Sequence, residues 1–77
     1  MRLCEGIPNH TYLIKGINFE NTVRLRLETI GVYKGSMVRI WKKKHSGTMI
    51  IKIYGTRWAI GKTLTLGIEV EEDMNND

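Results

Sequence analysis

The chain has 77 residues but only one cysteine, one proline and one phenylalanine. A single cysteine excludes an internal disulfide, although a chain of this size buries only roughly 60% of its unfolded surface on folding. Alanine, the best helix former, also occurs once. Because isoleucine, valine and threonine are frequent instead, we expect one compact domain made mainly of strands.

Long hydrophobic runs are absent as well. The longest uninterrupted aliphatic run is Met49-Ile50-Ile51, far short of the roughly 20 residues that span a bilayer. The first six residues contain no apolar segment of the kind found in signal peptides. Together with the lone Cys4, which agrees with a reducing compartment, this pattern predicts a cytoplasmic protein.

Acidic residues are scarce in most of the chain. Residues 1–68 hold all 12 lysines and arginines but only Glu5, Glu20 and Glu28 (+9), whereas residues 69–77 hold five acids (−5), for a total of +4. A basic body attracts phosphates, anionic lipid headgroups or acidic protein surfaces. Charges of this kind are also often no more than a solvated face.

Glycines and polar clusters divide the chain into short segments. Apolar alternation predicts strands at 12–19, 37–43, 48–54, 56–60 and 65–71, with Gly16 as a bulge or bend in the first. Gly61-Lys62-Thr63 predicts a turn before the last strand. Residues 72–77 have no apolar period, so we expect them to form a disordered acidic tail.

One segment has the period of a helix. Asn21 can cap its start, Val23, Leu27 and Ile30 share one face, and Gly31 follows where a left-handed residue often ends a helix. This helix would lie between the first and second strands and cover one end of the core. About five short strands in so small a chain then predict an all-β, SH3-like barrel formed by residues 1–71.

The opposite face of this helix is a candidate contact surface. At 100° per residue, Leu25 points away from the core, beside Arg24 and Glu28. An exposed leucine next to an arginine suits a protein contact. A single exposed apolar residue without a partner, or one covered by a loop, is nevertheless the more common case.

Residues that could carry catalysis or hold a metal are few. His10 and His45 fall in expected loops without a glutamate or cysteine at ligand spacing, and Cys4 has no recognisable activating base. Gly61-Lys62-Thr63 matches only the end of a phosphate-binding loop. We therefore expect no enzyme and no required cofactor, with at most weak, adventitious binding of divalent transition metals.

Trp41, followed by Lys42, Lys43 and Lys44, offers a second candidate surface at the hairpin. Basic residues next to an exposed aromatic ring can bind single-stranded nucleic acid, or face an anionic membrane. A charged hairpin is also a common solubilising device. Because the aromatic residues form no stacking ladder, nucleic acid is the alternative partner rather than the favoured one.

Residues 26–40, RLETIGVYKGSMVRI, resemble the R-L-x-x-L-G-L-x-x-G-x-x-V-x-V signature of the FeoA family. The closing part of the chain, from Gly55 to Ile60 and then Leu64, Ile68 and Val70, is also similar to that family. The two stretches together span most of residues 10–71. Lys34 and the Gly61-Lys62 pair depart from the family pattern, which affects the contact surface more than the fold.

The resemblance implies an SH3-like accessory protein of ferrous iron (Fe²⁺) uptake, which is not an enzyme. It would act with a membrane permease that carries a cytosolic GTPase domain. We hypothesise that Arg24, Leu25, Glu28 and Tyr33 bind the cytosolic part of that permease and modulate transport. The basic body would then work at the inner face of the membrane, where each lysine or arginine contributes about 1 kcal/mol.

Overall fold

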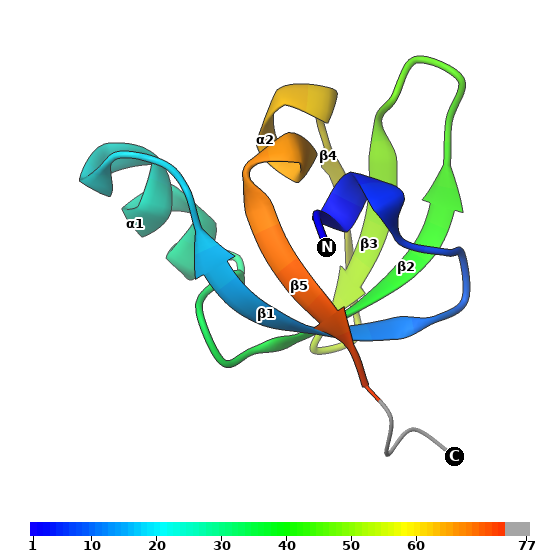
Figure 1. Ribbon diagram of the computed structural model, residues 1–77, viewed down its shortest axis with the longest axis horizontal. Helices are drawn as coiled ribbons and strands as arrows, with labels where there is room; N and C mark the ends of the chain where they lie inside the picture. Colours follow the sequence, from blue (N-terminus) through cyan, green and yellow to red (C-terminus); the bar gives the residue numbers. More distant parts are fainter. Residues whose placement is uncertain (74–77) are drawn as a thin grey trace.

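The computed structural model describes residues 1–73 and contains one antiparallel sheet of five strands in the order β4-β3-β2-β1-β5. The strands are β1 (Thr11–Ile17), β2 (Met37–Lys43), β3 (Met49–Ile53), β4 (Thr56–Ile60) and β5 (Ile68–Glu72). The helices are α1 (Asn21–Thr29), α2 (Lys62–Leu66) and a short 3₁₀ turn, η1 (Leu3–Glu5). The sheet curls on itself (Figure 1), and α1 lies between β1 and β2 along the chain. This arrangement confirms the expected SH3-like barrel.

The core lies inside the curled sheet and follows the alternation of the strands. In β2, Val38 and Ile40 are buried while Arg39 and Trp41 are exposed, as a pleated strand with one buried face requires. The cluster also takes in one residue of η1 and one of α1. Its buried members are Leu3, Tyr12, Ile14, Leu27, Val32, Val38, Ile40, Met49, Ile51, Ile53, Ile60, Ile68 and Val70.

Two register shifts bend the sheet. The first lies between Ile14 and Gly16 of β1, where the sequence indicated a bulge, and this prediction is confirmed. The second leaves Trp41 as an extra residue in β2, opposite β3. Because a bulge increases the local twist of its strand, the two shifts help five short strands to close around one core.

The C-terminus of α1 directs the chain back towards the sheet. Gly31 has a φ of 97°, and its N–H donates to the carbonyl of Glu28 at 3.0 Å. The N–H of Val32 donates to the carbonyl of Leu27 at 2.8 Å, which completes a Schellman motif. Both Leu27 and Val32 are buried, and the apolar face of α1 packs against the core as predicted.

The N-terminus of α1 differs from the expectation that Asn21 caps it. Asn21 is the first helical residue, and the extended Glu20 precedes it without a side-chain capping bond. The N–H of Arg24 donates to the carbonyl of Glu20 at 3.0 Å. Because this end of the helix is exposed, water can satisfy the remaining N–H groups, and a side-chain cap is not required.

The segment before the last strand was predicted wrongly. Lys62–Leu66 forms α2 instead of a turn followed by the start of a strand, and β5 begins at Ile68. The buried Thr65 donates its hydroxyl to the carbonyl of Lys62 at 2.9 Å, which a helical turn allows. Leu66 at the end of α2 and Ile68 at the start of β5 are two positions apart. In the sequence they therefore continue the alternation of the last strand, although they belong to different elements.

The last strand runs further than expected. Glu72, which the sequence assigned to an acidic tail, belongs to β5, and the N–H of Asp73 donates to the carbonyl of Thr11 at 3.0 Å. Residues 74–77 of that expected tail lie outside the described residues. Within residues 1–73, none of the helices has the length and apolar character needed to cross a membrane.

Candidate functional site

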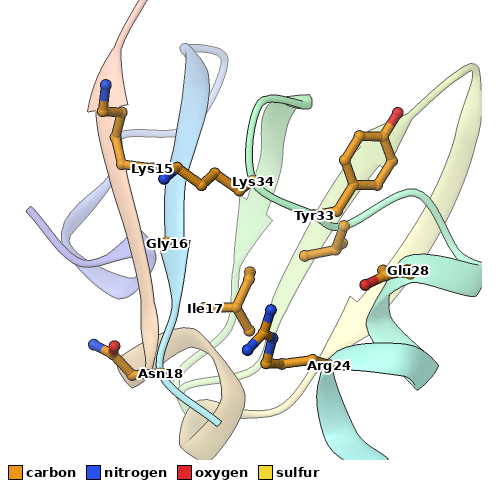
Figure 2. A pocket seen from close by; sticks show the side chains of 9 residues that line it. Lys15, Gly16, Ile17, Asn18, Arg24, Glu28, Tyr33 and Lys34 are labelled. Atoms are coloured by element: carbon orange, nitrogen blue, oxygen red, sulfur yellow. The ribbon is translucent and has the colours of Figure 1, made fainter. Parts of the chain in front are cut away.

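A cleft of about 270 Å³ lies between the end of β1, α1 and the loop that follows α1 (Figure 2). Each of these three elements contributes polar or charged side chains to its walls. The residues that line it are Lys15, Gly16, Ile17, Asn18, Arg24, Glu28, Val32, Tyr33 and Lys34. We call this space the helix cleft.

Local structure fixes the walls of the helix cleft. Arg24 and Glu28 are four residues apart on α1, so both side chains lie on the same face of the helix. The loop is held by Ser36, whose hydroxyl donates to the carbonyl of Tyr33 at 2.8 Å. Gly35, at a φ of 99°, turns the chain and donates its N–H to the carbonyl of Ile14 at 2.9 Å, which ties the loop to β1.

The helix cleft is mainly basic. Lys15, Arg24 and Lys34 line it together with one acid, Glu28. The Lys15 Nζ lies 3.8 Å from Glu71 Oε1, but neither Arg24 nor Lys34 has an ion pair within residues 1–73. In Figure 2, Arg24 and Glu28 project from α1 towards the space bordered by Ile17. Such a cleft can hold a segment that carries carboxylates.

A second cleft, of about 360 Å³, shares Glu28 and Tyr33 with the first. Its other walls come from the end of α1 and from the tight turn between β3 and β4. Tyr54 and Gly55, with φ values of 49° and 81°, form that turn, as expected for a type I′ hairpin. The lining residues are Glu28, Thr29, Ile30, Gly31, Tyr33, Ile53, Tyr54, Thr56 and Trp58.

The hydroxyls of Tyr33 and Tyr54 lie 2.7 Å apart at the border of the second cleft. This hydrogen bond raises the pKa of Tyr33 above its ordinary value of 10.0, because the bond favours the neutral phenol over the phenolate. The pair joins the loop after α1 to the β3–β4 turn. Nothing in the sequence indicated this contact, since the residues are 21 positions apart.

We expect Tyr54→Phe to return the pKa of Tyr33 towards 10.0. The stabilisation from the raised pKa is fully present below pH 10 and is lost as the pH rises through the pKa of Tyr33 in the folded protein. Ultraviolet titration of wild type and variant, with stability measured on both sides of pH 10, tests this expectation. Identical Tyr33 titration curves in the two proteins would contradict it.

The four residues of the predicted partner surface do not all share one cavity. Arg24, Glu28 and Tyr33 line the helix cleft, whereas Leu25 is 60% exposed on α1 and lines neither cleft. The sequence missed Lys15 and Lys34, which line this site from β1 and from the loop. The turn signal at Gly35 could have located Lys34, because that turn returns the chain to β1.

The second predicted surface includes a contact that the sequence did not indicate. Trp41 is 42% exposed, but the guanidinium of Arg57 lies 4.0 Å from the centre of its ring, as in a cation–π contact. Lys43 donates to the carbonyl of Gly6 at 3.1 Å. Lys42 and Lys44 are exposed. The cation that contacts the Trp41 ring is thus Arg57 of β4, which the sequence did not identify.

Candidate metal ligands are dispersed. Within residues 1–73, no group of three histidine, cysteine, aspartate or glutamate side chains could hold a metal ion. His10 Nδ1 lies 3.0 Å from Glu72 Oε2, His45 is exposed in the β2–β3 loop, and Cys4 is a free, half-buried thiol.

The curled five-stranded sheet, with one helix inserted after its first strand, defines a small SH3-like domain with a charged cleft beside that helix. The family model of the FeoA domain matches residues 1–72 of the sequence, and the chain belongs to this family. The family is linked to ferrous iron transport, and its members are small accessory domains that are not known as enzymes. A search of curated proteins finds no match to the chain.

Solved structures share this fold. A crystal structure of an iron uptake regulatory protein, FeoA, is 26% identical, with a TM-score of 0.86 over 94% of this chain and 96% of that one. The FeoA protein of Chlorobium tepidum is 19% identical, with a TM-score of 0.87 over 100% and 74% of the two chains. Stenotrophomonas maltophilia FeoA, solved with zinc and described as a prokaryotic SH3 domain protein, is 22% identical, with a TM-score of 0.76 over 92% and 89%.

Proposed function

We propose that this protein is a cytoplasmic accessory protein of ferrous iron uptake, which binds the cytosolic part of a membrane permease with a GTPase domain and modulates transport. It acts as a protein-interaction module and carries out no reaction of its own. The observation that supports this proposal is the meeting of Arg24, Glu28 and Tyr33 in the helix cleft, next to the exposed Leu25.

The site combines the elements of a protein contact. Leu25 is 60% exposed, and burying a leucine side chain against a partner contributes about 1.5–3 kcal/mol. Arg24 can hold a carboxylate of the partner through two parallel hydrogen bonds, and Glu28 can accept from a cation or a backbone N–H. In many protein interfaces, a few residues contribute most of the binding energy. Here Leu25 would supply the apolar contact, and the charged groups beside it would fix the orientation of the partner.

We expect Leu25→Asp to abolish co-purification with the isolated cytosolic domain of the candidate permease. The substitution removes the apolar anchor and buries a charge in the contact, while the exposed position leaves the fold intact. Pull-down with the purified domain, together with thermal unfolding of the variant, measures both effects.

Ile7→Asp is the matched control, because Ile7 is 53% exposed and its segment, between η1 and β1, lies on the opposite side of the barrel from α1 (Figure 1). This control should bind like wild type. Unchanged binding by Leu25→Asp, or equal losses in both variants, contradicts the assignment of this surface.

The same proposal includes a minor role for metals. The protein needs no cofactor in this account, and binding of divalent transition metals would be weak. Within residues 1–73 no three-ligand cluster is present, whereas a structural zinc site normally uses four nitrogen or sulfur ligands. Stenotrophomonas maltophilia FeoA was nevertheless solved with zinc, so titration with zinc provides a direct check.

A further inference from the structure

The outer face of β2, β3 and β4 carries a row of cations. Arg39 of β2 pairs in register with Lys52 of β3, and Lys52 pairs with Arg57 of β4. All three side chains are exposed, and Arg39 and Lys52 are each flanked by buried residues of their own strands. Because residues directly opposite one another point to the same side of a sheet, the three charges form one row on the outer face.

Within residues 1–73, none of the ion pairs joins this row to an acid. Residues 29–68 contain eight lysines and arginines and no aspartate or glutamate. Within residues 1–73, the ion pairs involve Met1, Arg2, His10 and Lys15, and none involves the cations of β2, β3 or β4. The acids of β5 therefore neutralise other parts of the barrel.

Such a row is unfavourable for the isolated protein, because like charges directly opposite each other destabilise a sheet. Two apolar side chains accompany the cations. Trp41 lies on the same face, since the guanidinium of Arg57 stacks on its ring. Ile50, half-buried, alternates with the inward Met49 and Ile51 and so also faces outward. We call Arg39, Trp41, Ile50, Lys52 and Arg57 the basic sheet face.

We propose that the basic sheet face docks on the surface of a bilayer that contains anionic phospholipids. The cations are spread across three neighbouring strands, so several headgroup phosphates can be contacted at once. Tryptophan is enriched at the level of lipid headgroups, where its ring is apolar and its N–H can donate a hydrogen bond. Exposed cations near such a surface are attracted over roughly one Debye length, about 8 Å at physiological salt.

The geometry favours a bilayer over a single nucleic acid strand. Strand binding uses a groove with aromatic rings on which bases stack. On the basic sheet face, Arg57 already covers one side of the Trp41 ring. Neither of the two clefts is lined by any residue of this face. The surface also shares no residue with the predicted permease contact, so the two proposals can fail separately.

Vesicle sedimentation tests this inference with the full chain. Wild type should bind vesicles of phosphatidylcholine and phosphatidylglycerol, but not vesicles of phosphatidylcholine alone. The triple variant Arg39→Gln, Lys52→Gln, Arg57→Gln should lower the partition coefficient by roughly 100-fold, equivalent to about 1 kcal/mol for each cation. Thermal unfolding checks that the variant is folded, which is expected because all three side chains are exposed and the loss of the Arg57–Trp41 contact is offset by relief of the repulsion between the cations.

The control removes the same total charge from elsewhere. In Arg2→Gln, Arg26→Gln, Lys62→Gln, all three at exposed positions, the net charge equals that of the triple variant, but the basic sheet face is intact, so most of the vesicle binding should remain. In a Trp58→Phe background, Trp41 is the sole tryptophan, and its fluorescence should shift to the blue on binding to anionic vesicles.

Three results would overturn the inference. The first is equal binding to neutral and anionic vesicles, or no binding to either. The second is an equal loss in both triple variants, which would indicate net charge alone. The third is binding to a single-stranded oligonucleotide that exceeds vesicle binding and is lost in the Arg39, Lys52, Arg57 variant, which would assign this face to nucleic acid.

Discussion

Replacing Gly31 with alanine is expected to lower the free energy of unfolding by about 3 kcal/mol. Gly31 has a φ of 97°, a conformation that costs an L-residue with a side chain roughly 1–2 kcal/mol. An added Cβ would also lie 2.6 Å from Ile53 Cγ2 and 3.1 Å from the ring of Tyr54. Moving these side chains adds the cost of an overpacked core, typically about 1–3 kcal/mol.

Gly35→Ala separates these two costs. Gly35 has nearly the same φ, 99°, but a Cβ there meets no atom within 4 Å. This variant should lose only about 1 kcal/mol, after the gain from a stiffer unfolded chain is included. Urea unfolding with a common m-value gives both differences. Equal losses at the two positions would show that the close approach to Ile53 does not contribute to the destabilisation at Gly31.

Leu27→Ala is expected to cost about 3 kcal/mol, whereas Leu25→Ala on the same helix should cost less than about 0.5 kcal/mol. Leu27 is 4% exposed and belongs to the core, and Leu25 is 60% exposed. Truncating a buried leucine loses its transfer energy and leaves a cavity, and an exposed position has neither term. Because both changes are leucine to alanine within α1, differences in helix propensity largely cancel.

The two leucine variants also distinguish structure from partner binding. Leu27→Ala should leave the affinity for the cytosolic domain of the proposed permease partner nearly unchanged at temperatures where the variant is folded. Leu25→Ala should weaken that affinity while chemical unfolding remains that of wild type. If Leu25→Ala destabilised the protein as strongly as Leu27→Ala, Leu25 would be part of the core and could not serve as a free anchor.

Most of the fold could be predicted from the sequence because its signals are local. The alternation around Val38 and Ile40 in β2 is set by a period of two residues along one strand, and one buried face fixes it. The end of α1 was equally clear, since Gly31 follows the last turn where a left-handed residue is favoured. Such patterns need no knowledge of distant segments.

The remaining features depend on contacts between distant segments. In the helical turn before β5, Thr65 is buried. The sequence does not indicate this, because Leu66 and Ile68 alternate as they would in a strand. At the candidate sites, Tyr33 and Tyr54 meet across 21 residues, and Arg57 reaches Trp41 across β3. Once a hairpin register is assumed, the row of Arg39, Lys52 and Arg57 becomes visible, but the register itself depends on the bulge at Trp41.

The uneven placement of charge makes this barrel an electric dipole. Glu69, Glu71 and Glu72 of β5 lie beside the N-terminal ammonium, Lys15 and His10, whereas the region of β2, β3 and β4 has cations and no acid, so the positive end of the dipole is at these three strands. In the field of an anionic surface, a dipole experiences a torque that turns its positive end forward before any contact forms. The protein would therefore reach such a surface already oriented, and added salt would slow its capture by shortening the range of that torque.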